Sequence, residues 1–86
     1  MKPIRDKIDA IDKKLINLLA KRTEFVVELG EIKKQKNLPI GDKNREMEIL
    51  AGVQKLAEKH GLNPQFIKKL YAEIINESKR IQSHEK

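Results

Sequence analysis

Apolar residues in the N-terminal part of the chain recur at alternating intervals of four and three residues. The series is interrupted only at position 22 and consists of Ile4, Ile8, Ile11, Leu15, Leu18, Phe25, Leu29 and Ile32. This spacing forms a heptad seam along one face of a helix, so the pattern predicts one helix from residue 4 to residue 36. The helix should stop in segment 37–41, because Pro39 disfavours the helical conformation at Leu38 and Gly41 loosens the turn.

Two shorter amphipathic helices are predicted after this stop. The first opens at Asp42, a preferred N-cap residue, and runs to about Lys59, with Gly61 following its end. The second starts at Asn63-Pro64, an N-cap followed by a proline in the first turn, and runs to about residue 82. Their apolar stripes are Met47, Ile49, Leu50, Val53, Leu56 and Ala57, and Phe66, Ile67, Leu70, Tyr71, Ile74, Ile75 and Ile81.

The length of the first helix bears on how its seam can be buried. Such a helix is roughly 50 Å long, whereas a compact domain of this size has a radius of gyration of only ~12 Å. The two later helices can cover at most one side of it, so the apolar seam is more easily buried against the same seam of a second copy of the chain. We therefore expect an all-α single domain over residues 1–86, with three helices per protomer and an intertwined homodimer in which the long helices pair.

Composition narrows the classes of function. The core must be aliphatic, since 38% of residues are hydrophobic and only 3% aromatic, and the lack of cysteine excludes disulfides and thiolate chemistry. The start resembles no signal peptide, and no apolar run approaches the ~20 residues of a membrane span, so we expect a cytoplasmic protein. The net charge of +6 favours an anionic partner, which could be nucleic acid, an acidic membrane or a small carboxylate.

Charged residues lie on or beside the seam of the first helix. Arg22 occupies the seam itself, where a buried unpaired charge is destabilising. It could reach solvent or meet a structural carboxylate, or an anionic ligand could enter the bundle there. Lys33 lies three turns after Arg22 on nearly the same face of the helix. Arg5 lies on the same line along the helix as Lys33, immediately beside the seam. Arg22 and Lys33 could grip two ends of one small dianion, although Arg5 and Lys33 could also be ordinary flanking charges.

Polar residues also interrupt the later helices. Ser78 and Gln82 continue the apolar stripe of the last helix, where a serine usually bonds back to its own helix and a terminal glutamine is usually exposed. Arg45 and Glu46 lie in the first turn of the second helix, where an acid complements the helix dipole. We find no metal-ligand cluster, no nucleophile with a partner base and no phosphate loop in the sequence, and we expect no metal or cofactor.

These features together resemble the all-α chorismate mutases over nearly the whole chain, from Ile4 to Gln82. The matching segments are Ile4-Arg5-Asp6-Lys7-Ile8-Asp9-Ala10-Ile11-Asp12, Leu18-Leu19-Ala20-Lys21-Arg22, Gly30-Glu31-Ile32-Lys33, Pro39-Ile40-Gly41-Asp42-Lys43-Asn44-Arg45-Glu46 and Ser78-Lys79-Arg80-Ile81-Gln82. The family often carries Arg where Gly41 stands and an acid where Asn44 stands, so the loop departs from the pattern in detail.

The resemblance implies a role for each matched polar residue. Arg22 would hold one carboxylate of chorismate, and Arg5 would reach the other carboxylate from the partner subunit. Lys33 would touch the ether oxygen and a carboxylate, and Gln82 would donate to the ether oxygen. Glu46 would bind the ring hydroxyl, and Ser78 would assist at a carboxylate. Asp42 and Arg45 would shape the loop.

The implied reaction, conversion of chorismate to prephenate on the way to Phe and Tyr, requires no nucleophile, base or metal. Catalysis must come from holding the reactive conformer and stabilising charge on the ether oxygen, which suits Arg22, Lys33 and Gln82. Two alternatives stay open. One is an isochorismate pyruvate-lyase on the same scaffold, and the other is a non-catalytic dimeric interaction module, for which nucleic acid is disfavoured because base-stacking aromatics are nearly absent.

Overall fold

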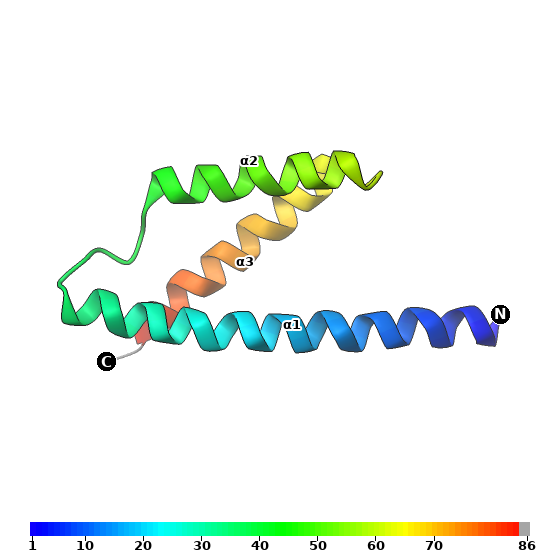
Figure 1. Cartoon of the computed structure of the whole chain (residues 1–86), viewed down its shortest axis with the longest axis horizontal. Helices are drawn as coiled ribbons and strands as arrows, with labels where there is room; N and C mark the ends of the chain where they lie inside the picture. Colours follow the sequence, from blue (N-terminus) through cyan, green and yellow to red (C-terminus); the bar gives the residue numbers. More distant parts are fainter. Residues whose placement is uncertain (85–86) are drawn as a thin grey trace.

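The computed structural model describes residues 1–84, which form three α-helices and no strand (Figure 1). They are α1 (Lys2–Gln35), α2 (Lys43–Lys59) and α3 (Pro64–His84). The all-α class is confirmed, and all three helices lie within two residues of their predicted bounds. None of these helices has a stretch long and apolar enough to cross a membrane.

The two predicted N-caps are present. Asp42 has an extended backbone, and its Oδ1 accepts a hydrogen bond from the Arg45 amide at 3.1 Å, so its carboxylate satisfies a free donor at the start of α2. Asn63 does the same for α3, where its Oδ1 accepts from the amides of Gln65 at 2.9 Å and Phe66 at 3.3 Å. These short-range bonds explain why sequence alone located both starts.

The ends of α1 and α2 share one geometry. In α2, Gly61 adopts a left-handed φ of 73°, and the Leu62 amide donates back to the Ala57 carbonyl at 2.8 Å. In α1 the left-handed residue is Asn37, with φ 55°, and the Leu38 amide donates to the Lys33 carbonyl at 2.8 Å. The stop of α1 was predicted in the right segment, but Asn37 makes the turn, ahead of the proline to which the stop was attributed.

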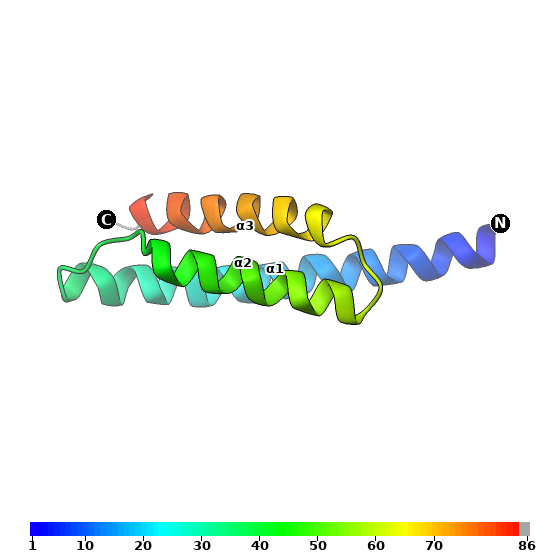
Figure 2. The same ribbon diagram turned by 90° about the horizontal axis from the view of Figure 1, so that it is seen from above.

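Helix α3 crosses diagonally from α2 to α1 on one side of both helices and packs against each, whereas α1 and α2 do not contact each other (Figures 1 and 2). The N-terminal turns of α1 extend beyond the turn between α2 and α3 (Figure 2). The protomer measures 52 × 24 × 15 Å and has a radius of gyration of 15.6 Å. A compact chain of this length would have a radius of only about 12 Å, so this protomer is an open arrangement.

The core of the single protomer is small. Val26 of α1, Ala57 of α2 and Ile75 of α3 are the buried hydrophobic residues in the described part of the chain. The seam of α1 remains open to solvent, and Phe25 and Ile4 are 70% and 64% exposed. Exposed apolar stretches of this kind mark an interaction surface.

Candidate functional site

A cavity of about 170 Å³ lies where the C-terminal half of α1, the start of α2 and the C-terminal half of α3 converge. Seven of the eight predicted site residues line it, and only Arg5 does not. The seven are Arg22 and Lys33 of α1, Asp42, Arg45 and Glu46 at the start of α2, and Ser78 and Gln82 of α3. Val26, Leu29, Ile40, Ile49 and Ile75 supply an apolar part of the lining.

One end of the cavity is organised by Arg22. Its Nη1 donates a hydrogen bond to Ser78 Oγ at 2.5 Å, and the Ser78 hydroxyl in turn donates to the Ile74 carbonyl at 2.9 Å. Ser78 is buried, so its hydroxyl makes the expected bond to its own helix and also receives the guanidinium. A guanidinium has five N–H donors, and this contact uses one of them. The others remain able to bind a carboxylate in a two-point manner.

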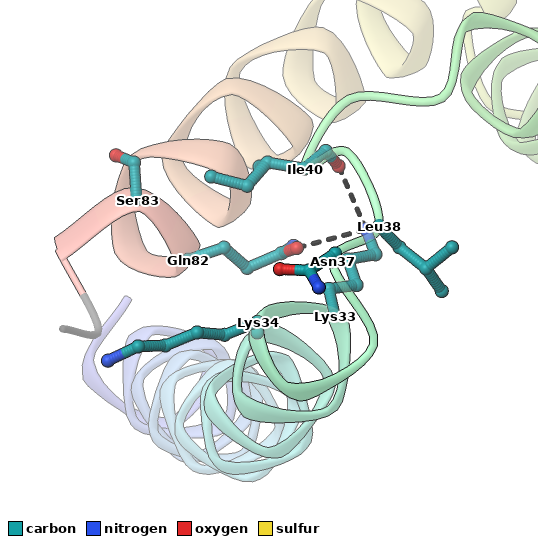
Figure 3. A pocket seen from close by; sticks show the side chains of 8 residues that line it. Lys33, Lys34, Asn37, Leu38, Ile40, Gln82 and Ser83 are labelled. Atoms are coloured by element: carbon teal, nitrogen blue, oxygen red, sulfur yellow. Dashed lines mark hydrogen bonds between the residues drawn. The ribbon is translucent and has the colours of Figure 1, made fainter.

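The other end of the cavity is organised by Lys33. Its ammonium donates to Gln82 Oε1 at 3.0 Å and to the Ile40 carbonyl at 2.8 Å, and both bonds are drawn in Figure 3. Because an ammonium has only donors, it takes the oxygen of the buried Gln82 amide and leaves the amide NH₂ as a donor. The left-handed turn at Asn37 folds the chain back, which brings the Ile40 carbonyl to Lys33. Two donor groups from different helices are thus held side by side.

A second hollow, of about 430 Å³, lies beside this pair (Figure 3). Lys33, Ile40 and Gln82 line both spaces, so these three residues form the wall between the cavity and the hollow. In Figure 3, Lys34 and Ser83 point away from the Lys33–Gln82 pair. The hydrogen-bonded pair therefore closes one end of the cavity.

The start of α2 contributes the acidic side of the cavity. Glu46 accepts from the ammonium of Lys79 on α3 at 3.3 Å, and both side chains are partly buried. Arg45 is exposed and pairs with Glu48 at 3.4 Å. Lys79 is a lining residue that the sequence reasoning missed. The signal that could have pointed to it is its spacing, four residues after Ile75 and three before Gln82, which places the three residues on one face of α3.

Arg5 lies apart from the other predicted residues. Seventeen positions separate it from Arg22, which along a helix amounts to about 25 Å. It is exposed, and the N-terminal turns that carry it extend beyond the rest of the protomer (Figure 2). Within one chain, Arg5 is not brought to the cavity.

The charges around the cavity suit an anion. Arg22, Lys33, Arg45 and Lys79 outnumber the carboxylates Asp42 and Glu46 by four to two. Among residues 1–84, no three His, Cys, Asp or Glu side chains group together in a way that could hold a metal ion. The arrangement can therefore bind a small anionic molecule against an apolar wall, with hydrogen-bond donors at both ends.

Comparison with known proteins gives matches over almost the whole chain. The profile of the family described as chorismate mutase type II matches residues 4–83. The T-protein of Enterobacter agglomerans is 44% identical over 75 residues, which are 87% of this chain and 20% of that protein. The bifunctional chorismate mutase/prephenate dehydratase of Escherichia coli strain K12 is 39% identical over 75 residues, or 87% of this chain and 19% of that protein.

A shorter relative is the chorismate mutase of Methanocaldococcus jannaschii, which is 35% identical over 79 residues. The match covers 92% of this chain and 80% of that protein. The chain thus spans about a fifth of the length of the T-protein and of the bifunctional relative, and most of the length of the third.

Proposed function

The chain belongs to the chorismate mutase type II family, and from this premise we propose that its cavity binds chorismate and converts it to prephenate. The observation that carries the proposal is the Lys33–Gln82 pair: the Lys33 ammonium donates to Gln82 Oε1 at 3.0 Å, which leaves the amide NH₂ as a second donor at one end of a cavity whose other end holds Arg22. Chorismate is a dianion with an ether oxygen between its two carboxylate-bearing parts, and this arrangement matches it in charge and donor placement.

The reaction is an intramolecular rearrangement. The ether C–O bond breaks while a C–C bond forms between the side chain and the ring, and every atom of the substrate is kept. No proton has to be transferred, so the site needs neither a base nor a nucleophile. What it must supply is a compact substrate conformation and stabilisation of the negative charge that grows on the ether oxygen.

Lys33 and Gln82 supply that stabilisation. Lys33 is positively charged, and the amide of Gln82 keeps its NH₂ free because the lysine occupies its oxygen. Both donors are fixed before the substrate arrives, so little reorganisation is needed at the moment of reaction. A millionfold acceleration corresponds to about 8 kcal/mol, and one preorganised donor contributes roughly 3–4 kcal/mol. Two donors together with conformational restriction are of the right size.

Arg22 and Glu46 orient the substrate. Arg22 is held by Ser78 and presents its free N–H groups to one carboxylate. Glu46 accepts a hydrogen bond from the ring hydroxyl, while Lys79 fixes the position of its carboxylate. Asp42 caps α2 and so sets the first turn that carries Arg45 and Glu46.

Arg5 binds the second carboxylate from a partner subunit in a homodimer. The open seam of α1 and the separation of α1 from α2 support this arrangement. If two α1 helices pair antiparallel about their midpoints, Arg5 of the partner subunit lies opposite Ile32, next to Lys33. The long helix then buries its seam and completes the site in the same step.

The test is to follow chorismate loss by absorbance with the purified protein in EDTA and to identify the product. Formation of prephenate, unaffected by the chelator, is the expected result. Salicylate and pyruvate formed from isochorismate, without prephenate from chorismate, would reassign the site to a lyase. A folded protein that neither binds nor converts chorismate would overturn the proposal.

A further inference from the structure

Gly30 of α1 lies directly against Gln82 of α3, beside the candidate site. It is buried, and a Cβ atom placed on it would lie 3.2 Å from Gln82 Cγ and 3.3 Å from Gln82 Cα. Contacts this short are tighter than about nine in ten real Cβ contacts, and one of these two atoms belongs to the backbone of α3. A side chain at position 30 would therefore push on the helix that carries Gln82.

The backbone at position 30 does not itself require glycine. Gly30 lies inside α1, and Gly61 is the glycine with a positive φ in the described chain. Glycine is less favourable than alanine inside a helix, so its presence weakens α1 locally. Gly52 in α2 offers a contrast, because a Cβ there would meet no atom within 4 Å. What position 30 needs is the absence of a side chain.

Gly30 is also placed to affect Lys33. The two residues are three positions apart on α1 and so share a face of the helix. Gln82 rests on Gly30 and accepts the Lys33 hydrogen bond at 3.0 Å (Figure 3). Gln82 thus contacts both Gly30 and Lys33 on the same face of α1.

We propose that Gly30 is a positioning residue for Gln82: its missing side chain lets α3 approach α1 closely enough for Lys33 and Gln82 to act on one substrate atom. The effect on kcat that this inference predicts rests on the proposed mutase activity. Misplacing a catalytic group by 1 Å can lower a rate by about a hundredfold. A shift of a few tenths of an ångström in Gln82 should lower kcat by roughly fivefold. KM should change less than kcat, because Arg22 lies about two helical turns from Gly30.

The experiment compares Gly30→Ala with Gly52→Ala in the full chain. Both substitutions improve helix propensity, but only Gly30→Ala also crowds α3. Gly52→Ala should therefore be at least as resistant to heat as the wild type, and circular dichroism checks that Gly30→Ala is folded at the assay temperature. Gly52→Ala should keep wild-type kcat, and Gly30→Ala should lose about fivefold. Equal kcat values for the two variants would overturn the proposal.

A second arm separates positioning from general loosening of the bundle. In a Gln82→Ala background, adding Gly30→Ala should lower kcat by less than about twofold, since the group being positioned is gone. The same fivefold loss in that background would show that Gly30 does not act through Gln82, and would overturn the proposal.

A third arm does not depend on activity. The side-chain NH₂ signals of Gln82, assigned by their loss in Gln82→Ala, should move in the ¹H–¹⁵N spectrum of Gly30→Ala and stay in place in Gly52→Ala. Unmoved signals would refute the positioning role. A wild-type protein without chorismate turnover would instead refute the proposed function, while these spectra would still decide the role of Gly30.

Discussion

The ammonium of Lys33 donates to the amide oxygen of Gln82 across 3.0 Å, although 49 residues separate the two in the chain. The bond ties the last turns of α1 to the last turns of α3 and fixes the direction of the amide. A buried glutamine can present either its oxygen or its nitrogen to a cavity, and the neighbouring lysine decides between them. The free NH₂ of Gln82 is therefore a consequence of Lys33.

Lys33→Ala should lower kcat/KM by at least roughly a hundredfold, since it removes the only charged donor proposed for the ether oxygen. The helical circular dichroism spectrum should remain, because the rest of the helix–helix packing is unchanged. Lys34→Ala is the matched control: its side chain points away from the Lys33–Gln82 pair, and near-normal turnover is expected. Lys33→Ala turnover close to that of the control would contradict the assigned role.

Gln82→Glu should move activity to lower pH. An ionised carboxylate at this position can only accept hydrogen bonds and would repel the charge growing on the ether oxygen, whereas the protonated acid can donate. Because only the protonated acid can donate, activity should rise as pH falls. A profile of kcat/KM against pH tests this, and a profile identical to that of the wild type would remove Gln82 from the ether oxygen.

Arg5→Ala and Arg22→Ala should each be nearly inactive, yet a mixture refolded together should recover activity. In a mixed dimer, the Arg5→Ala chain keeps Arg22 and receives Arg5 from its partner, so one complete site forms. With random pairing, about a quarter of the wild-type activity should return.

The control for this mixture is Arg22→Ala with Lys33→Ala. Both of these residues belong to the same protomer's part of the site, so no mixed dimer has a complete site and no activity should return. Absence of recovery in the Arg5→Ala mixture, with dimers present by ultracentrifugation, would show that Arg5 does not cross between subunits.

Glu77 and Arg80 on the exposed side of α3 give a pH prediction. Hydrogen bonds from Arg80 hold the pKa of the Glu77 carboxyl below its ordinary value, while the same contact raises the pKa of Arg80. The pair therefore stabilises the fold above the ordinary pKa of glutamate, and this contribution is lost as pH falls through the lowered pKa. It should be small, because both side chains are more than half exposed.

Carbon-detected NMR titration can check this sign. The Glu77 midpoint should lie below the ordinary glutamate value in the wild type and return toward it in Arg80→Ala. A midpoint that does not respond to Arg80→Ala would show that the pair is not formed in solution.

The sequence was sufficient for the helices and their starts. Asp42 and Asn63 were identifiable because an N-cap bonds to amides two or three residues away, so its signal is local. The open seam of α1 followed from helical periodicity, and Phe25 is indeed exposed in the single protomer. The stop of α1 was predicted in the right segment, but the role of Asn37 in the turn was not predicted, because asparagine enters the left-handed region less predictably than glycine does.

Helical spacing also predicted the helix faces on which Arg22, Lys33, Ser78 and Gln82 lie. The segments that resemble the chorismate mutases then grouped these four residues in one predicted site. Which of them touch was decided only in three dimensions: Arg22 with Ser78, Lys33 with Gln82, and Glu46 with the unforeseen Lys79. Sequence periodicity predicts the direction in which a side chain points from the axis of its own helix, because this direction depends only on residues a few positions apart. Contact between helices depends on how closely and at what angle they cross, and here a glycine at the crossing sets that distance.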